Sequence, residues 1–134
     1  MSSAEIRDRV RHRAGYKCEY CLLSEHNSPH AFHLEHIVAR QHGGCDDPSN
    51  LALACHRCNL QKGPNLTGID PESVQIVLLF HPRTDIWWDH FRKDGIHIQG
   101  TTPTGRATVR LLQMNEERRL DVRRIILSRG QYLW

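Results

Sequence analysis

Two Cys-X-X-Cys pairs, Cys18 with Cys21 and Cys55 with Cys58, constrain the fold of this chain more than any other feature. Each pair forms a tight turn that aims two thiolates at one ion, and four thiolates complete a tetrahedral structural zinc site. The alternatives are a redox dithiol or chance pairing. Two spaced pairs in a chain with five cysteines favour zinc. Because four sulfurs leave no open position for water, this ion would be structural and not catalytic.

Length and composition indicate a small protein with a modest core. The chain has 134 residues, 39% of them hydrophobic, and a mean hydropathy of -0.56, so a metal staple would help its stability. Its N-terminus lacks an apolar segment, and the longest apolar run, "IVLLF", is too short to span a bilayer. We therefore expect a cytoplasmic protein without a membrane partner, where reducing conditions favour metal-bound cysteines over disulfides. The net charge of +3 permits nucleic-acid binding without requiring it.

Residues 1–68 are expected to form one domain. A helix is predicted over 3–13 with Ser3 as its N-cap, and its arginines fit a solvated face as well as a phosphate-facing one. Short elements follow: a strand at "AFHLEHIVA", a Gly-Gly loop, a second piece at "NLALAC" and a helix near "CNLQK". The turn-rich "GPNLTGIDPES" marks the boundary to a second region, 69–134.

The sequence pattern of the second region predicts strands followed by helices, so we expect the fold class to be α+β. "VQIVLLF" indicates a buried strand, "DIWWDHF" a second and "GIHIQG" a third, before helices at "ATVRLLQM" and "NEERRLDVRRIILSRG". Asn115 is the expected N-cap of the last helix. We expect three aromatic residues in the core, Trp87, Trp88 and Phe91, with a base-stacking platform as the alternative. Four arginines of the last helix predict a solvated face, with DNA-backbone contact as the alternative: Arg118, Arg119, Arg123 and Arg124.

The stretch "HLEHIVARQHGG" lies between the cysteine pairs and holds a dense run of ionisable groups. On a regular strand, His33 and Glu35 share one face and His36 lies on the other. A loop or bulge after Glu35 would let Glu35 and His36 converge on one point. Since four thiolates already fill a zinc shell, these side chains are available for a second function.

The ordered set "CEYC", "LEHI", "HGG", "DDPSNLALAC" and "CNLQKG" resembles the four-cysteine branch of the HNH endonucleases, which have the ββα-metal fold, over about residues 14–66. The resemblance implies a hairpin followed by a helix, with one divalent ion held against a scissile phosphate. It implies a zinc-stapled core with a C-terminal strand-plus-helix extension packed on it. The extension carries no recognisable second active site.

By the same resemblance, His36 is the general base that deprotonates the attacking water, and a neutral imidazole suits that role. Glu35 and Asn59 would ligate Mg²⁺ or Mn²⁺, for which hard oxygen ligands are appropriate. Asn50 would tie the loop to the strand. Glutamate stands at position 35 where relatives usually have aspartate or histidine, and "VAR" stands where many have a proline. Two further residues are possible accessories, His33 and Lys62.

Each assignment has a structural alternative. Glu35 could pair with an arginine such as Arg40, and Asn50 could be an ordinary turn residue. Asn59 could cap a helix, Lys62 could be solvated, and His33 could be a hydrogen-bonded strand histidine.

The joint spacing of these residues favours a metal-dependent HNH endonuclease acting on DNA, with duplex as the expected partner. A non-catalytic zinc module that binds nucleic acid and an RNA-directed nuclease remain as alternatives, because nothing in these residues distinguishes ribose from deoxyribose. Base readout and oligomeric state are not encoded in this motif.

Overall fold

A computed structural model describes all residues, 1–134. The fold is α+β, as predicted, with short helices and three two-stranded antiparallel sheets. The chain divides into two compact units, the first made of residues 1–65 and 81–84 and the second of residues 66–80 and 85–134. None of the helices has the length and apolar character needed to cross a membrane.

The first unit begins with helix α1 (Ser3–Arg13), which has the predicted span. Its N-cap is Ser2 and not Ser3, so that prediction was wrong by one residue. The Ser2 hydroxyl accepts from the Glu5 amide while the Glu5 carboxylate accepts from the Ser2 amide, a capping box that satisfies two free amide groups. At the other end, the Arg13 guanidinium donates to the carbonyls of Pro48 and Leu51 at 2.9 and 2.6 Å.

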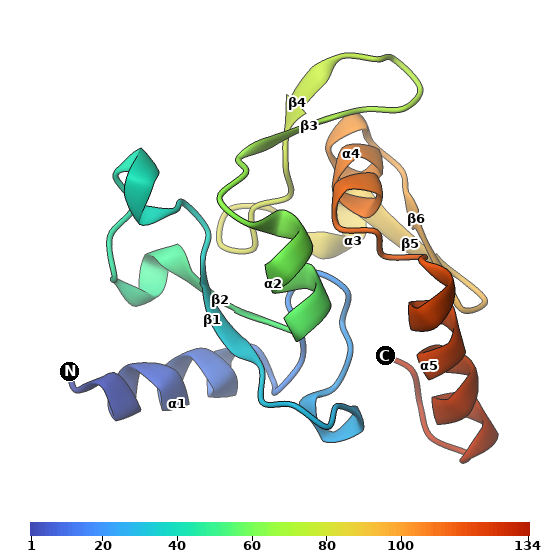
Figure 1. The fold of residues 1–134 in the computed structure, drawn as a ribbon, viewed down its shortest axis with the longest axis horizontal. Coiled ribbons are helices and arrows are strands. Elements are labelled where there is room, and N and C mark those ends of the chain that lie inside the picture. Colours follow the sequence, from blue (N-terminus) through green and yellow to red (C-terminus); the bar gives the residue numbers. More distant parts are fainter. The chain divides into compact units, whose positions relative to one another are not determined.

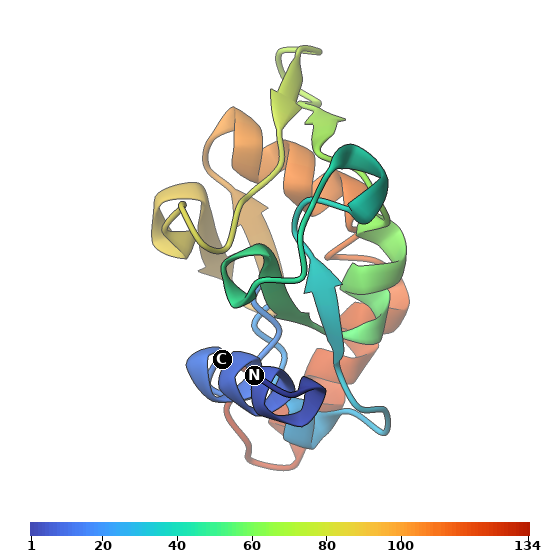
Figure 2. The same ribbon diagram turned by 90° about the vertical axis from the view of Figure 1, so that its left-hand side faces the viewer.

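The centre of the first unit is a hairpin followed by a helix, which confirms the predicted ββα core. Strand β1 (His33–His36) pairs antiparallel with β2 (Leu51–Ala54), and helix α2 (His56–Lys62) follows directly (Figures 1 and 2). Every residue of β2 is buried, because the strand is covered on both faces. Single 3-10 turns complete the unit: η1 (Glu25–Asn27), η2 (Arg40–His42) and η3 (Pro48–Asn50).

The second unit contains two hairpins and three helices. Strands β3 (Thr67–Ile69) and β4 (Ile76–Leu78) form the first hairpin, and β5 (Phe91–Asp94) and β6 (His97–Gly100) form the second. The helices are α3 (Trp87–His90), α4 (Pro103–Leu111) and α5 (Glu117–Ser128).

One strand prediction in this unit was confirmed only in part, and another was wrong. In "VQIVLLF" only Ile76–Leu78 forms a strand, and the side chains of Ile76 and Leu78 are exposed. "DIWWDHF" is not a strand but the single turn α3, after which β5 begins at Phe91. The "DIWWDHF" run is too short for periodicity to separate strand from helix. Trp87 and Phe91 are buried as expected, whereas Trp88 is 59% exposed and flanks the Lys93 ammonium.

The start of α5 also differs from the prediction. Its N-cap is Glu116, and the Asn115 side chain instead pairs with both backbone groups of Ile98. Arg119 and Arg123 do not belong to a solvated face: both are buried and donate to backbone carbonyls, including those of Leu112 and Met114 after α4. Carbonyls at the end of a helix lack intrahelical partners, so these arginines satisfy them.

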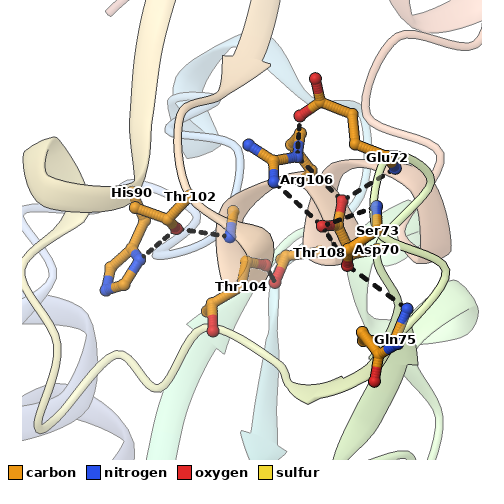
Figure 3. Close-up of polar contacts among 10 residues, drawn as sticks. Asp70, Glu72, Ser73, Gln75, His90, Thr102, Thr104, Arg106 and Thr108 are labelled. Atoms are coloured by element: carbon orange, nitrogen blue, oxygen red, sulfur yellow. Dashed lines mark hydrogen bonds and ion pairs between the residues drawn. The ribbon is translucent and has the colours of Figure 1, made fainter.

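A polar network holds α4 against the first hairpin of its unit (Figure 3). Arg106 of α4 donates to both oxygens of Asp70 at 2.8 and 2.9 Å, and Asp70 also accepts from the Ser73 hydroxyl at 2.7 Å. These bonds hold the pKa of the buried Asp70 carboxyl far below its ordinary value, Arg106 being the largest cause. At the start of α4, a Cβ on Gly105 would lie 1.9 Å from the His90 carbonyl oxygen, so only glycine fits there.

Candidate active site

Four buried cysteines from two distant segments meet at one point in the first unit. The sulfurs of Cys18, Cys21, Cys55 and Cys58 all lie within 4.8 Å of one another, and the Cys21 and Cys55 sulfurs are 3.7 Å apart. A tetrahedral ion with Zn–S bonds of about 2.3 Å separates its sulfurs by about 3.8 Å. The amides of Cys21 and Cys58 point at the sulfurs of Cys18 and Cys55 at 3.5 Å. This donor set fits a zinc ion, as the sequence predicts.

An open cavity of about 430 Å³ lies beside the hairpin and α2. It brings together three of the residues singled out in the sequence, Glu35, His36 and Asn59. The remainder of its lining comes from β1, the η2 turn and the residues after α2: Leu34, Ala39, Arg40, Gln41, Gly63 and Pro64. An open polar depression of this kind can admit a phosphate group with its hydration water.

Glu35 lies at the floor of the cavity with only 4% of its surface exposed. The Tyr20 hydroxyl donates to Oε2 at 2.6 Å, and the Lys62 ammonium lies 2.6 Å from Oε1. Burial raises the pKa of the Glu35 carboxyl, while Lys62 and Tyr20 oppose that rise by favouring the charged form. Each carboxylate oxygen can accept more than one bond, so both retain capacity for a cation.

Lys62 is not solvated. It is 2% exposed and also donates to the Ile37 carbonyl at 3.0 Å. In this arrangement its ammonium neutralises Glu35 from inside the protein. Sequence reasoning missed this pairing and the part of Tyr20 in it, because a lysine at the end of a helix and a tyrosine inside a Cys-X-X-Cys turn give no signal of their contact partner.

His36 is the last residue of β1, and its side chain is partly exposed. Its Nε2 lies 2.8 Å from Oδ1 of Asp46. The Arg40 guanidinium contacts the same oxygen, through Nε at 3.0 Å and through Nη2 at 2.9 Å. The bonds from His36 and Arg40 hold the pKa of Asp46 below its ordinary value. Arg40 therefore pairs with Asp46 and not with Glu35. Asp46 was not singled out from the sequence, where only its place in "GGCDDPSN" could have drawn attention to it.

Asn50 uses both ends of its amide to close the segment between the strands. Its Oδ1 accepts from the Val38 amide at 2.9 Å, and its Nδ2 donates to the carbonyls of Val38 and Cys45 at 2.9 and 2.8 Å. The side chain is 9% exposed and does not line the cavity. It links the backbone just after His36 to the loop that carries Asp46.

His33 faces a different neighbour. Its Nε2 lies 3.3 Å from Nδ1 of His56, the first residue of α2, and it does not line the cavity. His42 is exposed at the end of η2. Of the cavity residues, Glu35 and Asn59 offer a carboxylate and an amide oxygen, which are the donor types that Mg²⁺ and Mn²⁺ prefer. The donor set therefore fits a hard divalent cation.

Comparison with known proteins agrees with this geometry. The family model for HNH endonuclease matches residues 18–65, a segment that holds both cysteine pairs, the hairpin and α2. No curated protein and no solved structure matches the chain. The family match and the assembled cysteine site confirm the resemblance seen in the sequence. Residues 18–65 thus form a segment that matches the HNH endonuclease family model.

Proposed function

We propose that this protein is a metal-dependent endonuclease that hydrolyses phosphodiester bonds in DNA. The observation that carries the proposal is the shared cavity of Glu35, His36 and Asn59 inside the segment that matches the HNH family. A module that only binds nucleic acid would not require a carboxylate, an amide and an imidazole around one depression.

His36 is the general base of the proposed reaction. A neutral imidazole can take a proton from water, and general-base catalysis of this kind contributes about 10²- to 10⁴-fold to rate. The position of His36 at the edge of the cavity, partly exposed, supports this role because the attacking water must reach the ring.

Glu35 and Asn59 are the proposed ligands of a magnesium or manganese ion. When bound, such an ion supplies positive charge that stabilises the phosphorane and the leaving oxygen. Two protein ligands leave room for water and phosphate, as a catalytic divalent ion requires. Tyr20 and Lys62 contact the two oxygens of the Glu35 carboxylate and thereby orient it.

Asn50 holds the base in place in this proposal. Its three bonds fix the backbone at Val38, two residues after His36, and thereby the direction in which the strand ends. The cysteine cluster, with zinc bound, serves as the scaffold. The arrangement of four cysteines as one metal-ligating cluster supports a reducing, cytoplasmic location.

The zinc-loaded protein should nick supercoiled plasmid DNA when Mg²⁺ or Mn²⁺ is added and should not nick it in excess chelator. Glu35→Ala and Asn59→Ala should each raise the metal concentration needed for half-maximal cleavage. Binding of DNA without turnover under every metal would contradict the proposal and favour a non-catalytic zinc module. Cleavage of single-stranded RNA in preference to duplex, single-stranded and branched DNA would assign the activity to RNA.

A further inference from the structure

The loop between the two strands of the hairpin returns an acidic side chain to the end of β1. Asp46 lies ten positions after His36, yet its Oδ1 lies 2.8 Å from the His36 Nε2. This distance is that of a hydrogen bond between a ring N–H and a carboxylate. The two residues form a histidine–carboxylate pair at the rim of the proposed active site.

Several contacts hold the loop in this conformation. Asn50 bonds to both backbone groups of Val38 and to the Cys45 carbonyl, directly before Asp46. Gly44 passes so close to the backbone that follows β1 that an added Cβ would lie 1.7 Å from the Val38 carbonyl oxygen. Arg40 holds the Asp46 carboxylate from the other side of the loop. The carboxylate is thus placed by the fold, although it is itself exposed.

We infer that Asp46 is a positioning residue for His36 and selects its tautomer. A carboxylate accepts hydrogen bonds and does not donate them, so the proton of the neutral ring belongs on Nε2. The unprotonated nitrogen is then Nδ1, and this atom is the one that takes the proton from water. The part of this inference that concerns catalysis rests on the proposed function, whereas the tautomer does not.

The geometry also predicts which residue can take over the function of Asp46. Nε2 of His36 and both contacting nitrogens of Arg40 converge on a single oxygen, Oδ1. An asparagine would place its carbonyl oxygen there, because its amide group would meet donors in that position. Asp46→Asn should therefore preserve the tautomer, whereas Asp46→Ala should not. If Asp46 served through its negative charge, asparagine would fail as alanine does.

The direct test is NMR of the zinc-loaded, ¹⁵N-labelled protein without added magnesium, at a pH where the ¹⁵N shifts show the His36 ring to be neutral. Two-bond ¹H–¹⁵N correlations of the His36 ring report which nitrogen carries the proton. We expect an Nε2–H ring in the wild type and in Asp46→Asn, and a mixture of tautomers in Asp46→Ala. Equal tautomer populations in the wild type and Asp46→Ala, or an Nδ1–H ring in the wild type, would overturn the inference. This readout stands even if the protein proves not to be a nuclease.

Cleavage kinetics provide the second test, with zinc content measured to show that each variant is folded. Asp46→Ala should lower kcat by about 10- to 100-fold, as supporting partners of active-site histidines typically do, and leave KM nearly unchanged. Asp46→Asn should stay within a few-fold of the wild type. Asp8→Ala, which removes an exposed carboxylate of α1 in the same unit, is the matched control and should have no effect. An unchanged kcat in Asp46→Ala, or equal losses in the alanine and asparagine variants, would contradict the positioning role.

Discussion

The Lys62 ammonium lies 2.6 Å from Oε1 of Glu35, and both side chains are at least 95% buried. Charges are rarely buried without a partner, because each loses its hydration. Here the pair joins the end of α2 to the middle of β1, and its Glu35 lines the cavity. The proposed metal ligand is therefore held by the buried charge of Lys62, which the sequence left as a possible accessory residue or a solvated lysine.

Removing one partner of this pair should be costly. In Lys62→Met, Glu35 keeps its burial but loses its counter-charge, which typically destabilises a protein by about 3–5 kcal/mol. Urea denaturation of the zinc-loaded protein measures the free energy of unfolding of each variant. The double variant Lys62→Met/Glu35→Leu removes both charges and should recover much of the loss. A Lys62→Met protein as stable as the wild type would show that the pair does not form as described.

The cysteine cluster should bind one zinc ion per chain. Structural zinc sites contribute about 10–16 kcal/mol of apparent binding free energy, so loss of a ligand should unfold the first unit. Cys58→Ser should lose zinc and the circular dichroism of the folded unit, as should the wild type treated with chelator. Cys45→Ser is the matched control, since Cys45 is exposed and outside the cluster, and it should keep its zinc. Equal zinc content in both variants would rule out the four-cysteine site.

Asn50 should stabilise the loop that follows His36. Asn50→Ala leaves the Val38 amide and two carbonyls without their partner, at a cost of about 1–3 kcal/mol. The Val38 amide should then exchange with solvent faster, which hydrogen exchange by NMR measures at a single site. Asn50→Asp keeps the acceptor but not the donors and should be nearly as disruptive. Ser49→Ala, at the exposed neighbouring position, should leave the Val38 amide protected from hydrogen exchange. Equal protection of this amide in Asn50→Ala would show that other contacts hold the loop.

The Asp70–Arg106 pair predicts how the second unit responds to acid. The folded pKa of Asp70 is lowered, so its contribution to stability is present above the ordinary carboxyl pKa of about 4 and is lost as pH falls below it. In Arg106→Gln this pKa should rise toward its ordinary value, so the loss of stability between about pH 4 and pH 2 should become shallower. The free energy of unfolding of the second unit, measured over this pH range, gives the slope of stability against pH that tests the prediction.

Arg124→Gln is the control for that experiment. Arg124 pairs with Glu117 and Asp121 on the exposed face of α5, where ion pairs contribute little. The stability of Arg124→Gln should fall with decreasing pH in the same way as that of the wild type. Identical profiles for Arg106→Gln and the wild type would contradict the assigned cause of the low Asp70 pKa.

The zinc-stapled core could be predicted from sequence because its signals are local. Each cysteine pair forms its own turn, and the order of pairs, strands and helix leaves few ways to bring the sulfurs together. Helix α1 could be predicted for the same reason, since its cap and its apolar spacing lie within one segment. The error there was one residue, Ser2 for Ser3, because adjacent serines compete for the same capping position.

Other features depend on contacts between distant segments. Nothing local indicates that Lys62 is buried or that Asp46 returns to His36, because both depend on how the loop after β1 closes. In the second unit, the burial of Arg119 and Arg123 depends on carbonyls at the end of another helix. The "DIWWDHF" segment contains one buried and one exposed tryptophan, so composition alone could not separate a strand from a helical turn.

Single-turnover cleavage of DNA by His36→Ala tests the central claim most directly. At saturating Mg²⁺ or Mn²⁺, the variant should cleave about 10²- to 10⁴-fold more slowly than the wild type, the range expected for loss of a general base. His42→Ala, an exposed histidine on the following turn, should cleave at the wild-type rate. Both variants should hold one zinc ion, which excludes unfolding as the cause. Equal cleavage rates for His36→Ala and the wild type would contradict the assignment of His36 as the base and, with it, the proposed active site.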